Sequence, residues 1–341
     1  MLDGLHAAYS LFGAFLASAL ATWVVLGWLR RRAILDQPNE RSSHSLPTPR
    51  GGGLALTPVV LLGFALTQNI TAQPDLSLAI VFLAGAVLAL VSWTDDVKTL
   101  GPGPRFLAQL GTVAIALVFL APDARLFEAQ LPLVIERAIL GLGWVWFINL
   151  FNFMDGINGI TGAETASIGL GLTLVAAVGI GPAGEALGLT GLVLLGAALG
   201  FLLFNWGRAK LFLGDVGSVP LGFLLGFLLI DLALDGHLVP ALILPLYYLM
   251  DATITLGRRM AAGHKPWQAH RWHFYQQAVK KGWSHARVSG FILGINTGLI
   301  GLALWSVDGG GIVALPAALF WVGGWLLALR GPLNEPAQQA D

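Results

Sequence analysis

The chain has 341 residues, of which 56% are hydrophobic and only 11% are charged, whereas a soluble domain carries about 25% charged residues. This composition excludes an ordinary soluble domain and indicates an integral membrane protein. The formal net charge is zero, so no overall basic field favours nucleic acid as a partner. The absence of cysteine excludes disulfides, thiolate nucleophiles and cysteine metal sites.

Apolar runs of about 20 residues, the length that crosses a bilayer, recur along the whole chain. The first run is followed by Arg30, Arg31 and Arg32, the reverse of the charge order in a secretory signal, so we expect it to remain as a helix. Nothing indicates a linker or an internal repeat, and we expect a single transmembrane domain over residues 1–341. The sequence therefore predicts an all-α polytopic membrane protein with about eleven transmembrane helices, at residues 7–29, 53–70, 77–94, 105–121, 134–152, 163–180, 186–205, 217–234, 238–257, 288–306 and 312–329.

Lysine and arginine lie almost entirely on one side of this topology. Of the 19 basic residues, 17 fall in the segments 30–52, 95–105, 153–162, 206–216 and 258–287 or in the tail 330–341. Positive charge marks the cytoplasmic side of a membrane protein. We therefore expect these loops and the carboxyl terminus in the cytoplasm, and the amino terminus in the periplasm.

The stretch from Asn149 to Gly159 is the densest polar cluster, and it directly follows an apolar run. Asn149, Asn152 and Asp155 are spaced three apart, which places them on one stripe of a helix. Asn158 follows on a glycine-rich turn, where the backbone can approach a ligand closely. An aspartate at mid-membrane costs roughly 2.5–3.5 kcal/mol, so the cluster indicates a hydrated site. The alternative is a helix end capped by glycine and asparagine.

The loop between residues 36 and 53 contains Arg41, His44 and Arg50 and ends in three consecutive glycines. Arginine side chains and glycine amides are the groups that a phosphate-bearing ligand needs. Arg50 and His44 are therefore candidate substrate-binding residues. The alternative is an ordinary solvated loop on the positive side of the membrane.

Asp95 and Asp96 end another hydrophobic run and are followed by Lys98. Two adjacent carboxylates repel each other, and a cation relieves this repulsion, either Lys98 or a metal ion. Magnesium prefers carboxylate oxygens and substrate phosphates. The pair therefore indicates magnesium chemistry, unless it is only charge at the membrane interface.

Asp215 lies between glycines where a further apolar run begins, shortly after Arg208 and Lys210. An aspartate at that place would also serve as a helix N-cap. We favour Asp215 as a metal ligand, with Arg208 near a phosphate.

The longest basic loop, residues 258–287, holds His270, Arg271 and His273, which favour contacts to an anionic substrate. Asp251 precedes Arg258 by seven residues, so the two share one helix face. We expect either a salt bridge between them or a direct contact of Asp251 with the substrate.

Together these clusters offer carboxylates for magnesium, basic groups for phosphate, and amides for a base or a sugar. The chain has no nucleophile elbow, HExxH pattern or GxxxxGK[ST] loop, which argues against hydrolase, metalloprotease and NTPase functions. Phosphoryl transfer assisted by a metal is the chemistry that these parts suit.

Four segments in this order resemble the motifs of the polyprenyl-phosphate N-acetylhexosamine-1-phosphate transferases: residues 95–98, 149–159, 214–218 and 270–273. The similarity spans nearly the whole chain, roughly residues 10 to 330. The early glycine-rich loop and the helix count are more similar to the branch that initiates O-antigen than to the ten-helix muropeptide branch. The last loop departs from the pattern, because it continues from His273 with Phe, Tyr and Gln where relatives carry His-x-His-His.

The resemblance implies transfer of a sugar-1-phosphate from a UDP-N-acetylhexosamine to undecaprenyl phosphate, with release of UMP. The enzyme would lie in the bacterial inner membrane and initiate a cell-envelope polysaccharide such as O-antigen, enterobacterial common antigen or capsule. The resemblance also implies dependence on Mg²⁺, with Mn²⁺ as a substitute. It leaves open whether the chain forms a homodimer.

Residue roles follow by motif position only. The resemblance implies that Asp95 and Asp96 take part in catalysis and that Asp215 binds the metal, with Asn152 as a second ligand. Lys98 would contact the pyrophosphate, and Asp155 and Asn158 would hold the uridine. The remaining candidates for substrate binding are Asn149, Arg208, His270, Arg271, His273, Arg50 and His44.

Two mechanisms and two other functions stay open at this stage. A phosphate monoester has a second pKa near 6, so roughly nine tenths of the lipid acceptor is a dianion at pH 7. We therefore expect direct attack by the acceptor phosphate rather than a covalent aspartyl-phosphate intermediate. A polytopic secondary transporter is the main alternative, since polar residues inside a membrane also mark transport paths. A membrane prenyltransferase is less favoured, because the chain has one aspartate pair rather than two DDxxD motifs.

Overall fold

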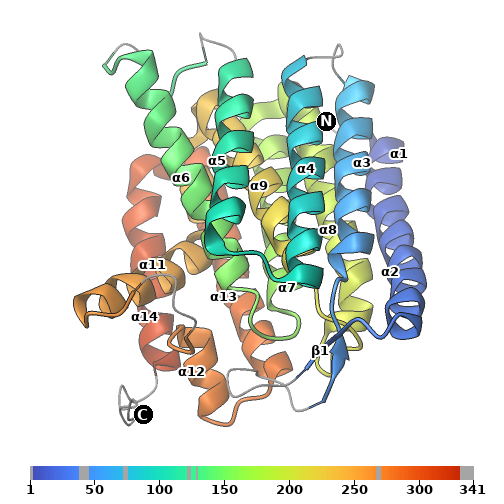
Figure 1. The fold of residues 1–341 in the computed structure, drawn as a ribbon. Coiled ribbons are helices and arrows are strands. Elements are labelled where there is room, and N and C mark those ends of the chain that lie inside the picture. The colour runs from blue at the N-terminus through green and yellow to red at the C-terminus, as the bar shows by residue number, and fades with distance from the viewer. Residues whose placement is uncertain are drawn as a thin grey trace.

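The computed structural model describes residues 3–37, 46–71, 76–120, 124–127, 130–265 and 270–330. The candidate residue His44 lies outside the described residues. In the described part of the chain nearly all regular structure is helical, and long helices run side by side as a bundle (Figure 1).

The main helices are α1 (Gly4–Ala8), α2 (Ala14–Arg31), α3 (Gly53–Thr71), α4 (Leu76–Lys98), α5 (Pro102–Phe119), α6 (Leu133–Phe153), α7 (Ile160–Val175), α8 (Glu185–Asn205), α9 (Asp215–Leu232), α10 (Leu238–Ile243), α11 (Leu246–Ala261), α12 (Phe274–Lys280), α13 (His285–Trp305) and α14 (Ala314–Leu329). Short π-helical turns continue α1, α7, α9 and α13, and 3₁₀ turns precede α8 and α14.

Eight helical stretches among the described residues are long and apolar enough to cross a membrane. The chain is therefore a polytopic membrane protein, as its composition predicts. The stretch 285–329 contains the last two expected helices, which a turn at Asp308 and Gly309 separates. The number eleven and the side that each terminus faces stay predictions.

The helix expected at residues 238–257 is divided in two. Its first part is α10, of only six residues, and α11 begins after Pro245. Proline has no N–H to donate to the preceding turn, so it favours a break of the helix at this point. Figure 1 shows α11 running across the bundle rather than along it.

Two small features were not predicted. A pair of two-residue antiparallel strands, β1 (Leu35–Asp36) and β2 (Thr48–Pro49), departs from the all-α expectation. The seven-residue helix α12 lies inside the segment that we expected to be a loop, 258–287.

Helix α9 lies at the centre of the bundle, where it contacts α3, α4, α6, α7 and α10. Beside it, α7 and α8 approach closely through Gly169 and Gly191, because a Cβ on Gly169 would lie 2.6 Å from the carbonyl oxygen of Gly191. Almost every residue from Val216 to Leu232 is buried. Asp215, the first residue of α9, is therefore held at the end of the most enclosed helix of the fold.

Candidate active site

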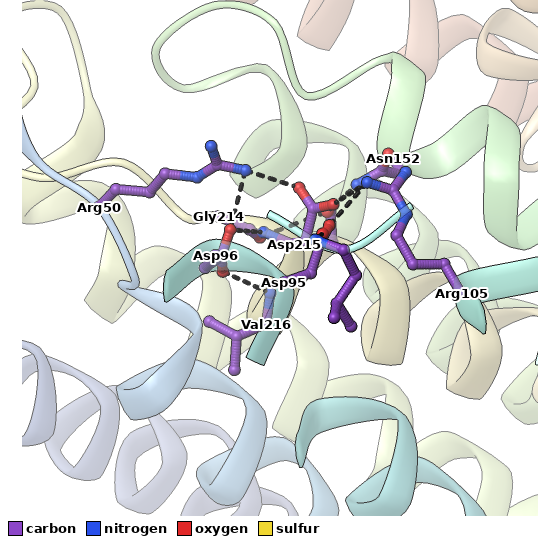
Figure 2. A network of polar contacts seen from close by, with 10 residues as sticks. Arg50, Asp95, Asp96, Arg105, Asn152, Gly214, Asp215 and Val216 are labelled. Carbon is purple, nitrogen blue, oxygen red and sulfur yellow. Dashed lines mark hydrogen bonds and ion pairs between the residues drawn. The ribbon is translucent and has the colours of Figure 1, made fainter. Parts of the chain in front are cut away.

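The carboxyl end of α4 and the amino end of α9 bring three carboxylates together (Figure 2). Asp95 and Asp96 lie in the last turn of α4, and Asp215 begins α9. The segments that contribute them are more than a hundred residues apart in the sequence. The convergence of Asp95 and Asp215, which the motifs predict, is thus present in the structure.

Asp96 holds the first turn of α9. Its Oδ1 accepts a hydrogen bond from the backbone N–H of Asp215 at 3.1 Å, and its Oδ2 accepts one from the N–H of Val216 at 2.9 Å. The Asp96 side chain is only 1% exposed. Gly214 allows this approach, since its φ is +76° and a Cβ there would lie 2.7 Å from Oδ2 of Asp96. Asp96 therefore caps α9 from a different helix.

Arg50 joins two of the carboxylates. Its Nη2 lies 2.8 Å from Oδ1 of Asp96 and 2.9 Å from Oδ1 of Asp215. The backbone of Arg50 pairs with Phe212 in an isolated parallel bridge. This pairing fixes the arginine beside the start of α9.

The glycine run after Arg50 has a structural role that differs from the expected one. The N–H groups of Gly51 and Gly52 donate to the carbonyl of Phe212, and the N–H of Gly53 donates to the carbonyl of Leu213. We expected these amides to bind a phosphate, but here they donate hydrogen bonds to the backbone of the segment that leads into α9.

Arg105, in the first turns of α5, is a site residue that the sequence did not reveal. Its Nη1 lies 2.6 Å from Oδ2 of Asp95 and 3.4 Å from Oδ2 of Asp215. The other oxygen of Asp95 accepts a hydrogen bond from the N–H of Leu100 at 2.6 Å. A small pocket lined by Asp95, Arg105, Gln109 and Asp215 opens at this place.

The polar stripe of α6 faces the same region. The Nδ2 of Asn152 donates to Oγ of Ser218 in the first turn of α9 at 2.8 Å. The Nδ2 of Asn149 donates to Oε1 of Gln109, which lines the small pocket, at 2.7 Å. The predicted helix does extend to Phe153, so Asn149 and Asn152 share one stripe as expected.

Asp155 lies in the turn after α6 rather than on the helix. Its Oδ1 accepts a hydrogen bond from Oγ1 of Thr161 at 2.5 Å. The carboxyl is withdrawn from water, and this desolvation raises the pKa of Asp155 to about 7, against the opposing effect of the Thr161 hydrogen bond. Asp155 is thus close to half-protonated at neutral pH.

Asn158 is engaged by the protein itself. Its Nδ2 donates to the carbonyl of Gly207 at 2.7 Å, and its carbonyl accepts a hydrogen bond from Oγ of Ser289 at 2.8 Å. These contacts tie the turn after α6 to the loop before α9 and to α13. Lys98, the last residue of α4, and Arg208, two further candidates, are exposed side chains.

Asp251 holds the loop that contains His270, Arg271 and His273, which we call the histidine loop. The expected salt bridge with Arg258 is wrong, because Asp251 pairs with Nδ1 of His273 at 3.1 Å and accepts the N–H groups of Phe274 and Tyr275 at 3.0 and 3.2 Å. Asp251 thereby caps α12 from α11. The Tyr275 hydroxyl donates to the carbonyl of Phe153 at 3.1 Å, which joins this loop to the end of α6.

His270 and His273 stack with ring centroids 4.9 Å apart. Burial lowers the pKa of His270 to about 3, assisted by the nearby positive charges of His273, Arg259 and His264, so its ring is neutral at pH 7. Arg271 is half-buried in the same loop.

Arg259 is a second residue that the sequence did not reveal. Its side chain is only 3% exposed, and its Nε and Nη1 have no hydrogen-bond partner among the described residues. A buried guanidinium is costly unless it is paired. Its charge lies near His270, and no described carboxylate lies within 4.0 Å of it, so α11 places a cation without an observed anion beside the histidines.

The donor set at the carboxylates suits a divalent cation. Among the residues that the structure describes, no group of three or more His, Cys, Asp or Glu is arranged as a complete metal site. However, one nitrogen of Arg105 lies within 3.4 Å of carboxylate oxygens of both Asp95 and Asp215. Those two carboxylates can therefore face a single cation, and oxygen donors of this kind are the ones that magnesium prefers.

Comparison with known proteins gives a family match over the middle of the chain. Residues 78–233 match the family model described as Glycosyl transferase family 4. This segment contains Asp95, Asp96, Asn152 and Asp215. The matched part therefore includes the three clustered carboxylates.

Several curated proteins are similar to the chain. It is 28% identical over 218 residues to the probable undecaprenyl-phosphate N-acetylglucosaminyl 1-phosphate transferase of Bacillus subtilis (strain 168), a match that covers 60% of this chain and 58% of that protein. It is 28% identical over 316 residues to the decaprenyl-phosphate N-acetylglucosaminephosphotransferase of Mycolicibacterium smegmatis, with 80% of this chain and 76% of that protein covered. It is also 28% identical over 328 residues to the phospho-N-acetylmuramoyl-pentapeptide-transferase of Synechococcus sp. (strain JA-2-3B'a(2-13)), with 86% and 91% covered.

Proposed function

We propose that the chain, whose residues 78–233 match glycosyl transferase family 4, transfers N-acetylhexosamine-1-phosphate from a UDP-sugar to undecaprenyl phosphate and releases UMP. The product would carry the sugar on undecaprenyl pyrophosphate and initiate a cell-envelope polysaccharide such as O-antigen. The enzyme would lie in the bacterial inner membrane with its carboxylate cluster on the cytoplasmic side, where the basic loops are predicted to be.

The observation that carries this proposal is the position of Arg105 between Asp95 and Asp215. Carboxylates from α4 and α9 converge on the one guanidinium that α5 contributes, and Asn152 contacts the same turn of α9 that Asp215 begins. A reaction between two phosphate groups needs such a concentration of charged groups at one point. Separate positions for these residues would have argued against the enzyme function.

We propose that Asp95 and Asp215 hold a magnesium ion, with Asn152 beside them as the further ligand. When bound, the ion would supply positive charge to the diphosphate of the donor and so lower the repulsion between the two anionic reactants. Asp96 would act indirectly, because both of its oxygens already accept N–H groups of α9. Its part in catalysis would be to fix the position of Asp215.

The phosphate groups would be bound by arginines. Arg50 and Arg105 already lie against the carboxylates. The charge of Arg259 lies near His270, and its Nε and Nη1 have no hydrogen-bond partner among the described residues. We propose that Arg259 pairs with a phosphate of the UDP-sugar, because a buried cation needs an anion and no described residue supplies a partner to its Nε and Nη1. His270, as a neutral ring, would donate or accept a hydrogen bond rather than provide charge.

The acceptor phosphate would attack directly. At pH 7 roughly nine tenths of a phosphate monoester is already the dianion, so removal of a proton by Asp95 would add little. A phosphosugar trapped on Asp95 or Asp96 in the absence of lipid acceptor would instead establish the covalent route.

The experiment is to incubate the purified protein with undecaprenyl phosphate, magnesium and a panel of UDP-sugars, and to measure UMP release. We expect release with at least one UDP-N-acetylhexosamine, and its loss in Asp215→Ala with the protein still folded. Asp235→Asn, in the turn after α9, is the matched control and should behave as the wild type. Uptake of a solute by proteoliposomes, with no UMP release from any UDP-sugar, would favour a secondary transporter instead.

A further inference from the structure

A groove of about 220 Å³ lies away from the carboxylate cluster, between α11, α12 and α14. Its walls are Ile254 of α11, Phe274 of α12, and Gly323, Leu326 and Leu327 of α14. None of these residues contacts Asp95, Asp96 or Asp215. The groove is therefore separate from the candidate active site.

The groove is apolar along its length. Ile254 is 38% exposed and Leu327 is 67% exposed, while Leu326 and Phe274 are buried. In a membrane protein, apolar side chains exposed along helix faces contact lipid chains. The walls of the groove thus suit a hydrocarbon chain lying against α14.

Cations surround one end of the groove. Arg258, in the last turn of α11, lies with its guanidinium carbon 5.7 Å from the centroid of the Phe274 ring. Arg330 follows directly after α14, and the Nζ of Lys281 lies 3.4 Å from the carbonyl oxygen of Ala328. Within the described residues, no carboxylate lies within 4.0 Å of Arg258 or Arg330. The positive charge at this end therefore has no carboxylate partner in the part of the chain that the structure describes.

We propose that this groove binds one anionic phospholipid of the surrounding bilayer, with its phosphate between Arg258 and Arg330 and an acyl chain along Ile254 and Leu327. Basic pockets between membrane helices on the cytoplasmic side bind anionic head groups, and both arginines stand at helix ends, where an interface would lie. A bilayer lipid fits better than the polyprenyl acceptor, because α14 contributes no residue to the carboxylate cluster that the acceptor phosphate must reach.

Binding at this place would be connected to the histidine loop. Phe274, which forms one wall of the groove, donates its N–H to Asp251, and Asp251 pairs with His273. A bound lipid would therefore hold α12 against α14 next to the loop that we assign to substrate.

The test is native mass spectrometry of the detergent-purified full chain, titrated with phosphatidylglycerol or with phosphatidylcholine. We expect preferential binding of phosphatidylglycerol. In the double variant Arg258→Gln/Arg330→Gln this affinity should fall about thirtyfold, which corresponds to about 2 kcal/mol at about 1 kcal/mol for each interfacial arginine. Arg30→Gln/Arg32→Gln, at the end of α2, is the control and should leave the affinity unchanged.

A second pair of variants tests the apolar part without changing charge. Gly323 lines the groove, and a Cβ there would meet only Cε of Met250, at 3.9 Å, so Gly323→Leu places a larger side chain in the groove. Gly324→Leu points into open space beside it and is the matched control. We expect loss of phosphatidylglycerol binding in Gly323→Leu alone. Equal binding of both phospholipids, retention in the arginine double variant, or displacement of phosphatidylglycerol by undecaprenyl phosphate would each overturn the proposal.

Discussion

Replacement of Asp96 separates a positioning role from a chemical one. Asp96→Ala removes both acceptors for the N–H groups of Asp215 and Val216 and removes one of the two carboxylates that pair with Arg50. Each hydrogen bond to a charged group contributes about 1.5–3 kcal/mol. Loss of one member of a buried ion pair costs about 3–5 kcal/mol.

These two figures describe the same side chain, so we do not add them, and we expect Asp96→Ala to lose about 3–5 kcal/mol of folding stability. Asp96→Asn keeps one oxygen as an acceptor and should lose about half as much. Native proteins have about 5–15 kcal/mol of stability. Asp96→Asn should therefore remain folded at assay temperature, which makes it the informative variant.

The measurements are thermal unfolding in detergent and UMP release over a range of magnesium concentrations. If Asp96 fixes Asp215, Asp96→Asn should unfold at a lower temperature and need more magnesium for half-maximal activity, yet recover activity when magnesium is saturating. A variant that unfolds at the wild-type temperature and stays inactive at saturating magnesium would refute this reasoning, because Asp96 would then act on the reacting groups.

Three further predictions concern other parts of the site. Because the pKa of Asp155 is raised to about 7 from its usual value of about 3.9, the folded state retains a proton that the unfolded chain releases, so stability should fall as pH rises from about 4 through 7. In Asp155→Asn the stability should vary less over this range, and parallel curves for the two proteins would contradict the assignment. Arg259→Met should keep or raise the unfolding temperature, while kcat/KM for the UDP-sugar falls at least tenfold. A lower unfolding temperature with unchanged kinetics would argue that Arg259 has a structural role. Gly214→Ala should lose about 1–3 kcal/mol of folding stability and most of its activity, because Gly214 has a φ of +76° and a Cβ there would contact Asp96. Gly103→Ala, at an open helical position, is the control and should change neither the unfolding temperature nor UMP release.

Much of the site could be predicted from local patterns. Asn149 and Asn152 could be placed on one stripe because helical spacing depends only on the sequence. The polar residues at the ends of apolar runs indicated where Asp95 and Asp215 lie, since hydrocarbon does not tolerate them elsewhere. These inferences need no knowledge of which helices are neighbours.

The site residues and contacts that the sequence did not reveal depend on which helices lie next to one another in the fold. Arg105 and Arg259 both follow the pattern of ordinary basic residues at membrane-helix ends, and nothing local distinguishes a paired or buried one from a solvated one. Asp251 has Arg258 at a suitable spacing, yet it pairs with His273 because α12 folds back onto α11. The contact partners of long charged side chains are set by tertiary packing, which no spacing encodes.

The two capping carboxylates restrict where substrate phosphates can bind. The amino end of a helix normally attracts anions. Gly214, the N-cap residue of α9, has no side chain to cap that helix, whereas His273 and Gln276 form a capping box at the start of α12. Asp96 and Asp251 already occupy these ends, with hydrogen bonds to the first N–H groups of each helix. The helix ends are thus filled by protein anions. Under the proposed function, the negative charge of the two phosphate-bearing substrates would therefore be met by arginine side chains and a divalent ion. Arg259 is the most informative single cation to remove, because its Nε and Nη1 have no hydrogen-bond partner among the described residues.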